Sequence, residues 1–346
     1  MIRFIAAMCA GLALISSLAH AADAAPAAPT APAAAVRVER ISVDSPALAG
    51  NPEGNSARRD VFVVLPPSYA SSPARRYPVV YALHGYGITP EKWFAMDKQD
   101  QIAARAFRNG VREMILVFPD TYTRHHGSMY STSATTGDWE AFITRDLVGY
   151  IDAHYRTIAN RASRGLMGHS MGGYGTVRLG MKYPGIYSSL YAMSACCLAA
   201  REITPEQGRQ VEAVKTMEQV SSAPFMVRTT LTAAAAWSPN PDKPPFYVDL
   251  PYEGGQLRPH VLAEWAANAP LAMLPQYVNH LRQYQAIALD VGNRDSLVDD
   301  NKALHEALDR FGIANTFEVY DGDHGSGVVS RFETRVLPFF SRHLQF

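Results

Sequence analysis

The sequence predicts an α/β fold: a mainly parallel sheet of eight strands, with helices on both faces and one inserted lid. Short apolar runs of strand length recur along the chain, and longer amphipathic stretches separate most of them. The later runs are nearly continuous in apolar residues, which is typical of strands buried on both faces. Because successive parallel strands need a crossover, usually a helix, this alternation favours a mainly parallel sheet.

The first two apolar runs are expected to differ from the rest. We expect residues 37–43 and 60–66 to pair as an antiparallel hairpin that opens the sheet. Residues 139–155 and 299–311 have the apolar spacing of amphipathic helices. The remaining six expected strands are 78–85, 114–120, 163–169, 187–194, 285–292 and 316–322.

The first residues have the features of a secretory signal peptide. Arg3 supplies an early positive charge, an apolar run extends from 4 to 18, and small residues stand at Ala19 and Ala21. The apolar run is shorter than the roughly 20 residues of a membrane-spanning helix. We therefore expect residues 1–21 to be removed on export, into the periplasm or beyond, with no stable membrane insertion afterwards.

The segment that follows, 22–36, contains only Ala, Pro, Thr, Val and one Asp. Such a segment has too few large apolar side chains to bury a core, and proline stiffens it, so we expect an extended linker. The remaining residues, 37–346, are expected to form one catalytic domain. The chain as a whole is 47% hydrophobic, which is enough for a substantial core.

The charge balance argues against two classes of partner. Thirty-two Lys and Arg residues balance 32 Asp and Glu residues, so the formal net charge is zero with neutral histidines. No net field then attracts nucleic acid or an anionic membrane. We expect a neutral or locally recognised substrate.

Loss of residues 1–21 would leave two cysteines, Cys196 and Cys197, which are neighbours in the chain. A disulfide between adjacent residues demands an unusual backbone. We therefore expect two small buried thiols rather than a structural bridge.

A serine flanked by glycines is the strongest chemical signal in the chain. Gly168-His169-Ser170-Met171-Gly172 fits G-x-S-x-G and stands between an expected strand and a helical stretch. At such a sharp turn the serine is held in a strained conformation with its oxygen above the sheet, and the glycines relieve crowding. We expect Ser170 to be a nucleophile, unless this is a glycine-rich loop with an incidental serine.

A nucleophilic serine needs a base, and the base needs an acid. In this architecture both follow the serine, in the order serine, acid, histidine, and each lies in a loop just after a strand. Asp295 follows the expected strand 285–292, and His324 follows the expected strand 316–322. We therefore expect Asp295 to be the acid and His324 to be the base.

Other residues compete for these roles. Asp290 lies inside its expected strand, whereas Asp299 and Asp300 open an expected helix, where carboxylates favour the helix dipole. The sequence DGDH at 321–324 also suggests a metal site, but no ligand cluster of known spacing accompanies it. We expect neither a metal nor an organic cofactor.

The negative charge of a tetrahedral intermediate needs preorganised donors. The sequence LHGYG at 83–87 follows the third expected strand, where one donor is expected, and the residue after the serine supplies the other. We assign these donors to the backbone N–H groups of Tyr86 and Met171. We expect His84 to brace the loop rather than to act as a second base.

One interval interrupts the alternation of strands and helices. Residues 198–282 separate the sixth and seventh expected strands, and 237–255 within them are dense in proline and aromatic residues. We expect a lid over the sheet in which Trp237, Phe246 and Tyr247 form a wall of the substrate pocket. A surface insertion without a role is the alternative.

Six segments carry a resemblance to a known family: LHGYG, FPDTYTRHHGSMY, GDWEAFITRDLVGYIDAHY, GLMGHSMGGYG, DVGNRDSL and DGDHG. The chain resembles the esterase D-like branch of the α/β-hydrolase fold, which includes feruloyl esterases, S-formylglutathione hydrolases and secreted mycolyltransferases. The resemblance spans about 55–345 and implies a triad of Ser170, His324 and Asp295, as the residues themselves indicate. Mycolyltransferases use a glutamate as the acid, so Asp295 favours the hydrolases.

The expected function is that of a secreted serine esterase, which hydrolyses a small-molecule, carbohydrate or lipid ester through an acyl-enzyme. One alternative is an acyltransferase that passes the acyl group to a sugar or lipid hydroxyl, because water and alcohols compete for the same intermediate. Another is a non-catalytic binding module on a hydrolase scaffold. The complete triad argues against the binding module.

Overall fold

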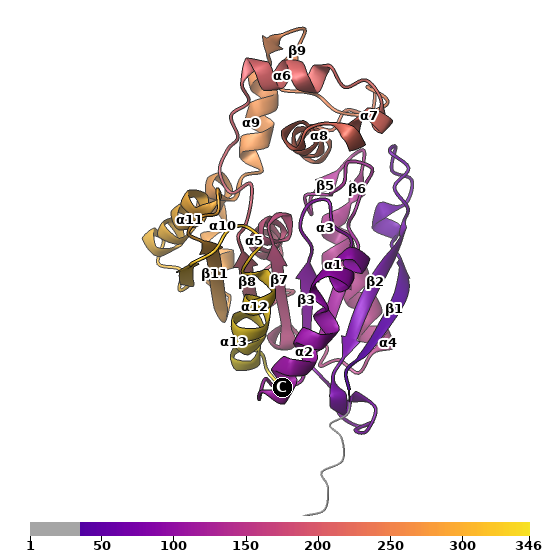
Figure 1. Cartoon of the computed structure of the whole chain (residues 1–346), viewed down its shortest axis with the longest axis vertical. Coiled ribbons are helices and arrows are strands. Elements are labelled where there is room, and N and C mark those ends of the chain that lie inside the picture. The colour runs from indigo at the N-terminus through magenta and orange to yellow at the C-terminus, as the bar shows by residue number, and fades with distance from the viewer. Residues whose placement is uncertain (1–34) are drawn as a thin grey trace, which may run out of the picture. The chain divides into compact units, whose positions relative to one another are not determined.

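The eight expected strands form one sheet in the computed structural model, which describes residues 35–346 (Figure 1). The expected signal peptide, 1–21, and the linker as far as residue 34 lie outside the described residues. The strand order is β1-β2-β4-β3-β7-β8-β11-β12. The bounds are β1 Arg37–Asp44, β2 Arg58–Leu65, β3 Val79–Leu83, β4 Ile115–Pro119, β7 Arg164–His169, β8 Ser189–Met193, β11 Ala286–Gly292 and β12 Thr316–Tyr320.

The pairing of the strands confirms the expected hairpin and the mainly parallel sheet. Strand β2 pairs antiparallel with β1, with Val38 opposite Val64, and antiparallel with β4 on its other side. Every other pairing in this sheet is parallel. Parallel strands end at the same edge of the sheet, so the loops after β3, β7, β8, β11 and β12 meet at that edge.

The central strands are apolar on both faces because helices cover both sides of the sheet. In β3, Val79, Tyr81 and Leu83 point into one hydrophobic cluster, while Val80 and Ala82 point into the other. This alternation is the two-residue period of a strand. Side chains of α4 (Leu147–His154), α5 (Met171–Lys182), α10 (Pro270–Leu281) and α11 (Val298–Arg310) complete the first cluster. Side chains of α1 (Pro90–Asp97), α2 (Gln99–Arg108) and α13 (Leu337–His343) complete the second.

The two expected helices are present with one irregularity. Residues 299–311 correspond to α11, and 139–155 form a helical stretch whose middle, Phe142–Asp146, is π-helical. A second π-helical segment, Phe332–Val336, joins α12 to α13. The helix bounds are α1 Pro90–Asp97, α2 Gln99–Arg108, α3 Trp139–Ala141, α4 Leu147–His154, α5 Met171–Lys182, α6 Pro205–Glu212, α7 Met217–Ser222, α8 Phe225–Trp237, α9 Pro259–Ala267, α10 Pro270–Leu281, α11 Val298–Arg310, α12 Val328–Arg331 and α13 Leu337–His343.

Most of the inserted interval forms a cap at one end of the sheet. Helices α6 to α9 gather there, together with a short ribbon of β9 (Tyr252–Glu253) and β10 (Gln256–Leu257) (Figure 1). We call residues 198–269 the lid. The expected lid extended to residue 282, but α10 packs against α5 and α11 and so belongs to the helical layer of the sheet. Another unexpected ribbon pairs β5 (Thr132–Ser133) with β6 (Gly137–Asp138).

Among the helices of residues 35–346, none combines the length and the apolar character that a membrane crossing requires.

Candidate active site

Ser170 occupies a turn that only glycines can flank. The serine lies between β7 and α5 with φ 57° and ψ −115°, a sparsely populated conformation for a residue with a side chain. A Cβ atom on Gly168 would lie 2.2 Å from the backbone of Gly172, and one on Gly172 would lie 2.0 Å from the Leu83 carbonyl oxygen. Any larger residue at these two positions would force the strand, the turn and the helix apart.

The structure brings Ser170, His324 and Asp295 into one hydrogen-bonded chain. His324 Nε2 lies 2.9 Å from Ser170 Oγ, and His324 Nδ1 lies 2.8 Å from Asp295 Oδ2. Because a carboxylate only accepts, Nδ1 carries the proton and Nε2 is free to accept from the serine hydroxyl. The Asp295 side chain is fully buried, whereas the His324 side chain is 43% exposed. The imidazole therefore has a buried partner on one side and an accessible nucleophile on the other.

Carboxylates in the sequence DGDH brace the loop that carries His324. Asp323 Oδ1 accepts the N–H groups of Gly325 at 3.0 Å and Ser326 at 2.8 Å, and Asp321 pairs with Arg294 from the neighbouring loop. No cluster of three or more metal-ligating side chains forms within residues 35–346. The two carboxylates of DGDH therefore stabilise the loop that carries His324.

The two residues whose backbone N–H groups are expected to form an oxyanion hole, Tyr86 and Met171, both lie at the pocket of Ser170. Met171 is the first residue of α5, where amides have no acceptor within the helix. Tyr86 follows β3 in a loop that runs alongside the nucleophile, since a Cβ atom on Gly85 would lie 3.5 Å from Ser170 Cβ. Both Tyr86 and Met171 line the same pocket as Ser170.

His84 stabilises the loop after β3 through hydrogen bonds of its buried ring. Its buried ring has Nδ1 2.8 Å from the Gly85 carbonyl oxygen, and Nε2 accepts the Thr121 N–H at 3.0 Å. Since a carbonyl oxygen only accepts, Nδ1 carries the proton. Burial lowers the pKa of His84, which keeps the ring neutral. The residue joins the loops after β3 and β4 and has no contact with the serine hydroxyl.

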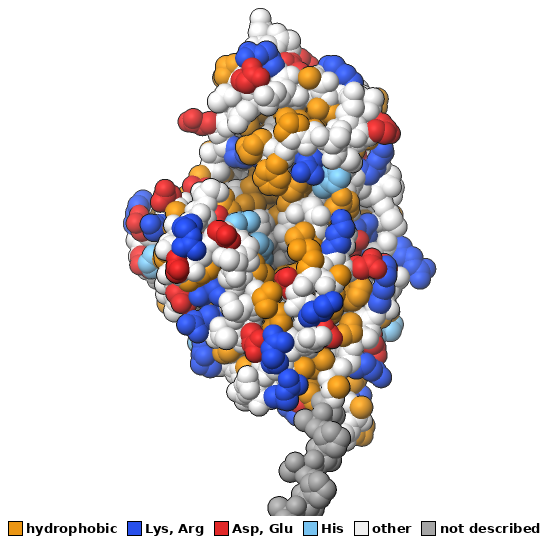
Figure 2. Space-filling model, viewed as in Figure 1, with side chains coloured by type: hydrophobic (Ala, Val, Ile, Leu, Met, Phe, Trp, Pro, Cys, Tyr) orange, Lys and Arg blue, Asp and Glu red, His pale blue; other side chains and the backbone are white. Residues whose placement is uncertain are grey.

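Ser170 opens into a pocket of about 440 Å³ between the lid and the sheet. Figure 2 shows hydrophobic side chains gathered around a hollow in this region, with histidine side chains beside it. One wall is the first part of α8, where Phe225 and Met226 are 58% and 43% exposed. The lining residues are Tyr86, Met129, Ser170, Met171, Cys196, Cys197, Ala199, Ala200, Arg201, Phe225, Met226, Thr229, Thr232, Ala233, Ser296, Leu297, Asp300 and His324.

Comparison with known proteins places this site in a family. The Esterase family model matches residues 55–328, which is most of the chain. The chain belongs to the Esterase family. The predicted relation to esterase D-like and feruloyl esterase-type α/β-hydrolases is thereby confirmed.

Individual members of the family resemble this chain over shorter stretches. An esterase of Mycobacterium tuberculosis is 33% identical over 133 residues, which is 37% of this chain and 27% of the relative. An S-formylglutathione hydrolase of Mus musculus is 27% identical over 154 residues, 39% of this chain and 51% of the relative. The chain thus spans about half or less of the length of these curated relatives. A solved ferulic acid esterase shares the fold, with a TM-score of 0.65 and 22% identity over 90% of this chain and 99% of that one.

His169 has a role in this esterase-family site that the sequence analysis missed. Its Nε2 lies 2.8 Å from the His324 carbonyl oxygen, and the two rings are 4.8 Å apart between centroids. Burial, with the adjacent His324, lowers the pKa of His169 to about 4, so the ring is neutral near pH 7. Since a carbonyl oxygen only accepts, Nε2–H is the donor. His169 therefore holds the main chain of the triad histidine.

The rival carboxylates have other partners or positions. Asp290 Oδ2 lies 2.6 Å from Arg331 Nε in a buried ion pair, which holds α12 against the sheet. Asp299 lies in the first turn of α11 with its side chain 93% exposed. Asp300 faces the pocket, and burial raises its pKa. Asp295 is the carboxylate in contact with His324.

The structure corrects the expected pocket wall. Trp237 is buried, with its ring 5.6 Å from Tyr174 and 6.1 Å from Trp265 between centroids. Phe246 lines a separate hollow on the lid, and Tyr247 lies beside it in the chain. These three residues are absent from the lining of the pocket at Ser170. The stretch 237–255 begins at the last residue of α8 and leads away from the pocket, so the earlier turns of α8 form the wall.

The two cysteines are free thiols, as expected, but they are half-buried and line the pocket rather than fully buried. They follow β8, where the chain turns from the sheet into the lid.

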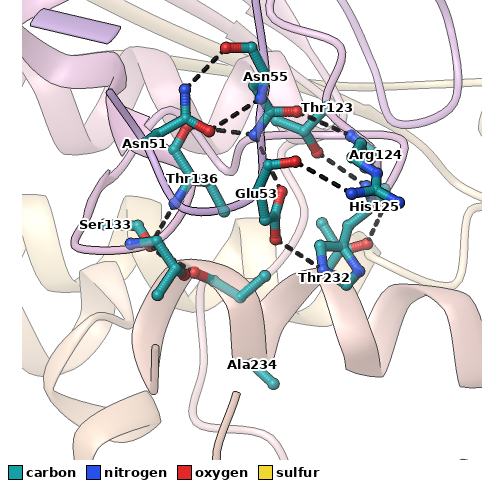
Figure 3. A network of polar contacts seen from close by, with 12 residues as sticks. Asn51, Glu53, Asn55, Thr123, Arg124, His125, Ser133, Thr136, Thr232 and Ala234 are labelled. Atoms are coloured by element: carbon teal, nitrogen blue, oxygen red, sulfur yellow. Dashed lines mark hydrogen bonds and ion pairs between the residues drawn. The ribbon is translucent and has the colours of Figure 1, made fainter. Parts of the chain in front are cut away.

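A buried polar network holds α8 against the sheet (Figure 3). Glu53, from the loop between β1 and β2, lies 2.7 Å from His125 Nε2, and both side chains are buried. Asn55 Nδ2 donates to Glu53 Oε2 at 2.9 Å. Thr232 of α8 donates through its hydroxyl to the His125 carbonyl oxygen at 2.6 Å. The ring of His125 thus lies against the Glu53 carboxylate, and its main chain binds the pocket wall through Thr232.

Proposed function

We propose that this chain is a serine esterase that hydrolyses carboxylic esters through an acyl-enzyme. The observation that carries the proposal is the hydrogen-bonded chain from Ser170 Oγ through His324 to Asp295 Oδ2, at the floor of an accessible pocket. Membership of the Esterase family supports the same chemistry. Two relatives are named as an esterase and as S-formylglutathione hydrolase, which points to acyl groups carried on oxygen or sulfur.

The geometry accounts for each step of such a reaction. His324 Nε2 accepts the hydroxyl proton as Ser170 Oγ attacks the ester carbonyl, and the Asp295 carboxylate stabilises the imidazolium that results. The N–H groups of Tyr86 and Met171 donate to the oxyanion. His324 then gives its proton to the leaving alcohol, and it activates a water molecule that releases the acid from the serine.

The pocket favours an acyl or alcohol group with an apolar surface. Methionine, phenylalanine, tyrosine and alanine side chains make up much of its lining, and its volume suits a small molecule or one end of a larger ester. A sugar or lipid ester would place its reacting end in the pocket and the remainder outside.

We further propose that the protein acts after export. The early arginine, the apolar run and the small residues at 19 and 21 support this proposal.

The proposed function is tested by ester turnover in the Ser170→Ala variant. Hydrolysis of nitrophenyl esters should fall by about 10⁴-fold or more because the nucleophile is lost. Ser330→Ala removes an exposed hydroxyl away from the site and serves as the matched control. A Ser170→Ala variant that turns over esters like the control would overturn the proposal. Adding alcohols to the wild-type assay separates hydrolysis from acyl transfer.

A further inference from the structure

Two thiols share the pocket with Ser170 and have no part in the proposed esterase reaction. Cys196 and Cys197 are neighbours in the chain, and their Sγ atoms lie 3.0 Å apart. Both are half-buried, and both line the pocket. A reagent that reaches the nucleophile therefore also reaches the thiols.

The backbone of this turn places both thiols on one side of the chain. Side chains of consecutive residues in a strand point in opposite directions. Here Ser194 and Cys197 have positive φ values of 42° and 58°, a conformation that residues with side chains rarely adopt. The turn is anchored, because Asn301 Nδ2 donates to the Ala195 carbonyl oxygen at 2.9 Å. The surrounding structure thus holds an unfavourable backbone that brings two sulfur atoms together.

The two thiols are electronically unequal. A hydrogen bond between the sulfur atoms lowers the pKa of Cys197 and raises that of Cys196. The guanidinium of Arg201, in the same pocket wall, lowers the pKa of Cys197 further. A thiolate is the nucleophile in thiol–disulfide exchange, and the positive charge of Arg201 favours the thiolate form of Cys197.

We propose that Cys196 and Cys197 form a redox modification site, which closes to a disulfide between adjacent residues and thereby slows reaction at Ser170. Cys197 thiolate attacks a small organic disulfide, which forms a mixed disulfide and releases one thiol. Cys196 then loses its proton and attacks Cys197 Sγ, which releases the second thiol. Two protein thiols are oxidised, and one external disulfide is reduced to two thiols.

The link to Ser170 is a direct backbone contact. The Cys196 N–H donates to the Ser170 carbonyl oxygen at 3.2 Å, and the Ser170 N–H donates to Met193 at the end of β8. Ring closure must shift the peptide between the cysteines, because adjacent Cα atoms lie about 3.8 Å apart and most disulfides join Cα atoms farther apart. That shift acts on the turn that aims the nucleophile. The effect on turnover rests on the proposed function, whereas the formation of the disulfide does not.

The disulfide between Cys196 and Cys197 should also be easy to reduce. Disulfides with strained geometry are more readily reduced, and labile disulfides are those that serve regulation. We therefore expect oxidation at this site to be reversible by a dithiol reductant.

The test follows the thiols and the ester turnover in the same samples. The protein is equilibrated with glutathione and glutathione disulfide at a series of ratios, and free thiols are then blocked with an alkylating reagent. The mass of the peptide that contains both cysteines is measured by mass spectrometry. With rising disulfide, this peptide should lose two hydrogens and gain no alkyl groups, and turnover should fall by at least roughly tenfold. Dithiothreitol should restore both.

Cys196→Ser and Cys197→Ser provide the matched variants. In Cys197→Ser, the ratio of turnover between the oxidising and the reducing sample should return to about one. In Cys196→Ser, the peptide should instead stop at a glutathione adduct on Cys197, because no second thiol can displace it. The proposal is overturned if both thiols stay open to alkylation, if only a stable glutathione adduct forms, or if the ring closes without a change in turnover. If the chain hydrolyses no ester, the proposed function fails, but the peptide masses still decide whether the ring closes.

Discussion

At the scale of single residues, we propose that His169 positions the main chain of His324 without taking part in bond making. Its ring donates to the main chain of His324, and its lowered pKa keeps it neutral, so that no second positive charge opposes the imidazolium of His324. This contact joins the last residue of β7 to the loop after β12. A positioning residue of this kind affects the chemical step more than substrate binding.

The substitution His169→Gln tests this role through the pH dependence of stability. In the unfolded chain the imidazole takes up a proton below its ordinary pKa of 6.5, whereas in the folded protein it stays neutral to about pH 4. The unfolded state therefore binds more protons between these values, and the free energy of unfolding falls as the pH falls. We expect a smaller fall in the variant, measured by urea unfolding at pH 7 and pH 5.

Kinetics supply the second readout for His169→Gln. We expect kcat to fall by about tenfold with little change in KM, because the lost contact holds the base and not the substrate. If the pH dependence of the free energy of unfolding and kcat are both unchanged in the variant, the contact between His169 and His324 contributes neither to stability nor to catalysis.

Asp295 is separated from its neighbours by another substitution. Asp295→Asn keeps the size of the side chain but favours the wrong tautomer of His324, so kcat should fall by roughly 10²- to 10⁴-fold near neutral pH. Asp299→Asn, at an exposed position in the next helix, is the matched control. Steady-state ester hydrolysis measures both. Equal damage from the two substitutions would mean that the acid is misassigned.

These residues also show what the sequence could and could not reveal. The positions of Ser170, Asp295 and His324 could be predicted because each directly follows a strand, and parallel strands end at one edge. The role of His169 could not be predicted from the sequence, because its partner is a main-chain carbonyl group 155 residues away. Its place inside the G-x-S-x-G motif was the one available signal.

At the scale of elements, helix α8 forms the pocket wall that the sequence analysis assigned to 237–255. Aromatic and proline content was the wrong guide, because Trp237 packs against Tyr174 of α5 and Phe246 lines a separate hollow. The better signal was helical spacing: Phe225, Thr229 and Thr232 recur at intervals of four and three residues, as on one helix face. Strands buried on both faces were predictable from their apolar runs. The ribbons of two-residue strands were not, since two residues show no periodicity.

Truncating the wall of α8 should change which esters are preferred. In Phe225→Ala and Met226→Ala, the ratio of kcat/KM for long against short acyl chains should shift by roughly tenfold, as apolar contacts to the chain are lost. Phe246→Ala, in the separate hollow of the lid, is the matched control. A series of nitrophenyl esters from acetate to octanoate measures the ratio. A shift in the Phe246 variant as large as in the other two would place the acyl site elsewhere.

At the scale of the whole molecule, residues far apart in the chain meet because the sheet aligns the ends of its strands. The loops after β3, β7, β11 and β12 carry the residues that we propose as oxyanion donors and triad, and the lid lines the pocket from the other side. The network around Glu53 and His125 ties the lid to the sheet (Figure 3). The mainly parallel sheet and its opening hairpin were predictable from the apolar runs, whereas the docking of the lid depends on buried polar contacts that no local pattern encodes.

Export makes a prediction about the whole chain. If residues 1–21 form a signal peptide, the protein recovered after secretory expression should begin at Ala22. N-terminal sequencing of that protein decides the point. A chain that retains Met1 in a membrane fraction would contradict the proposal of export.

The central claim is that Ser170 is the nucleophile, and covalent labelling tests it most directly. A fluorophosphonate probe reacts with a serine whose hydroxyl is activated by a neighbouring base. The account predicts one label on the wild-type protein, located by mass spectrometry on the peptide that contains Ser170, and no label on Ser170→Ala. A label on another residue, or equal labelling of the variant, would contradict it.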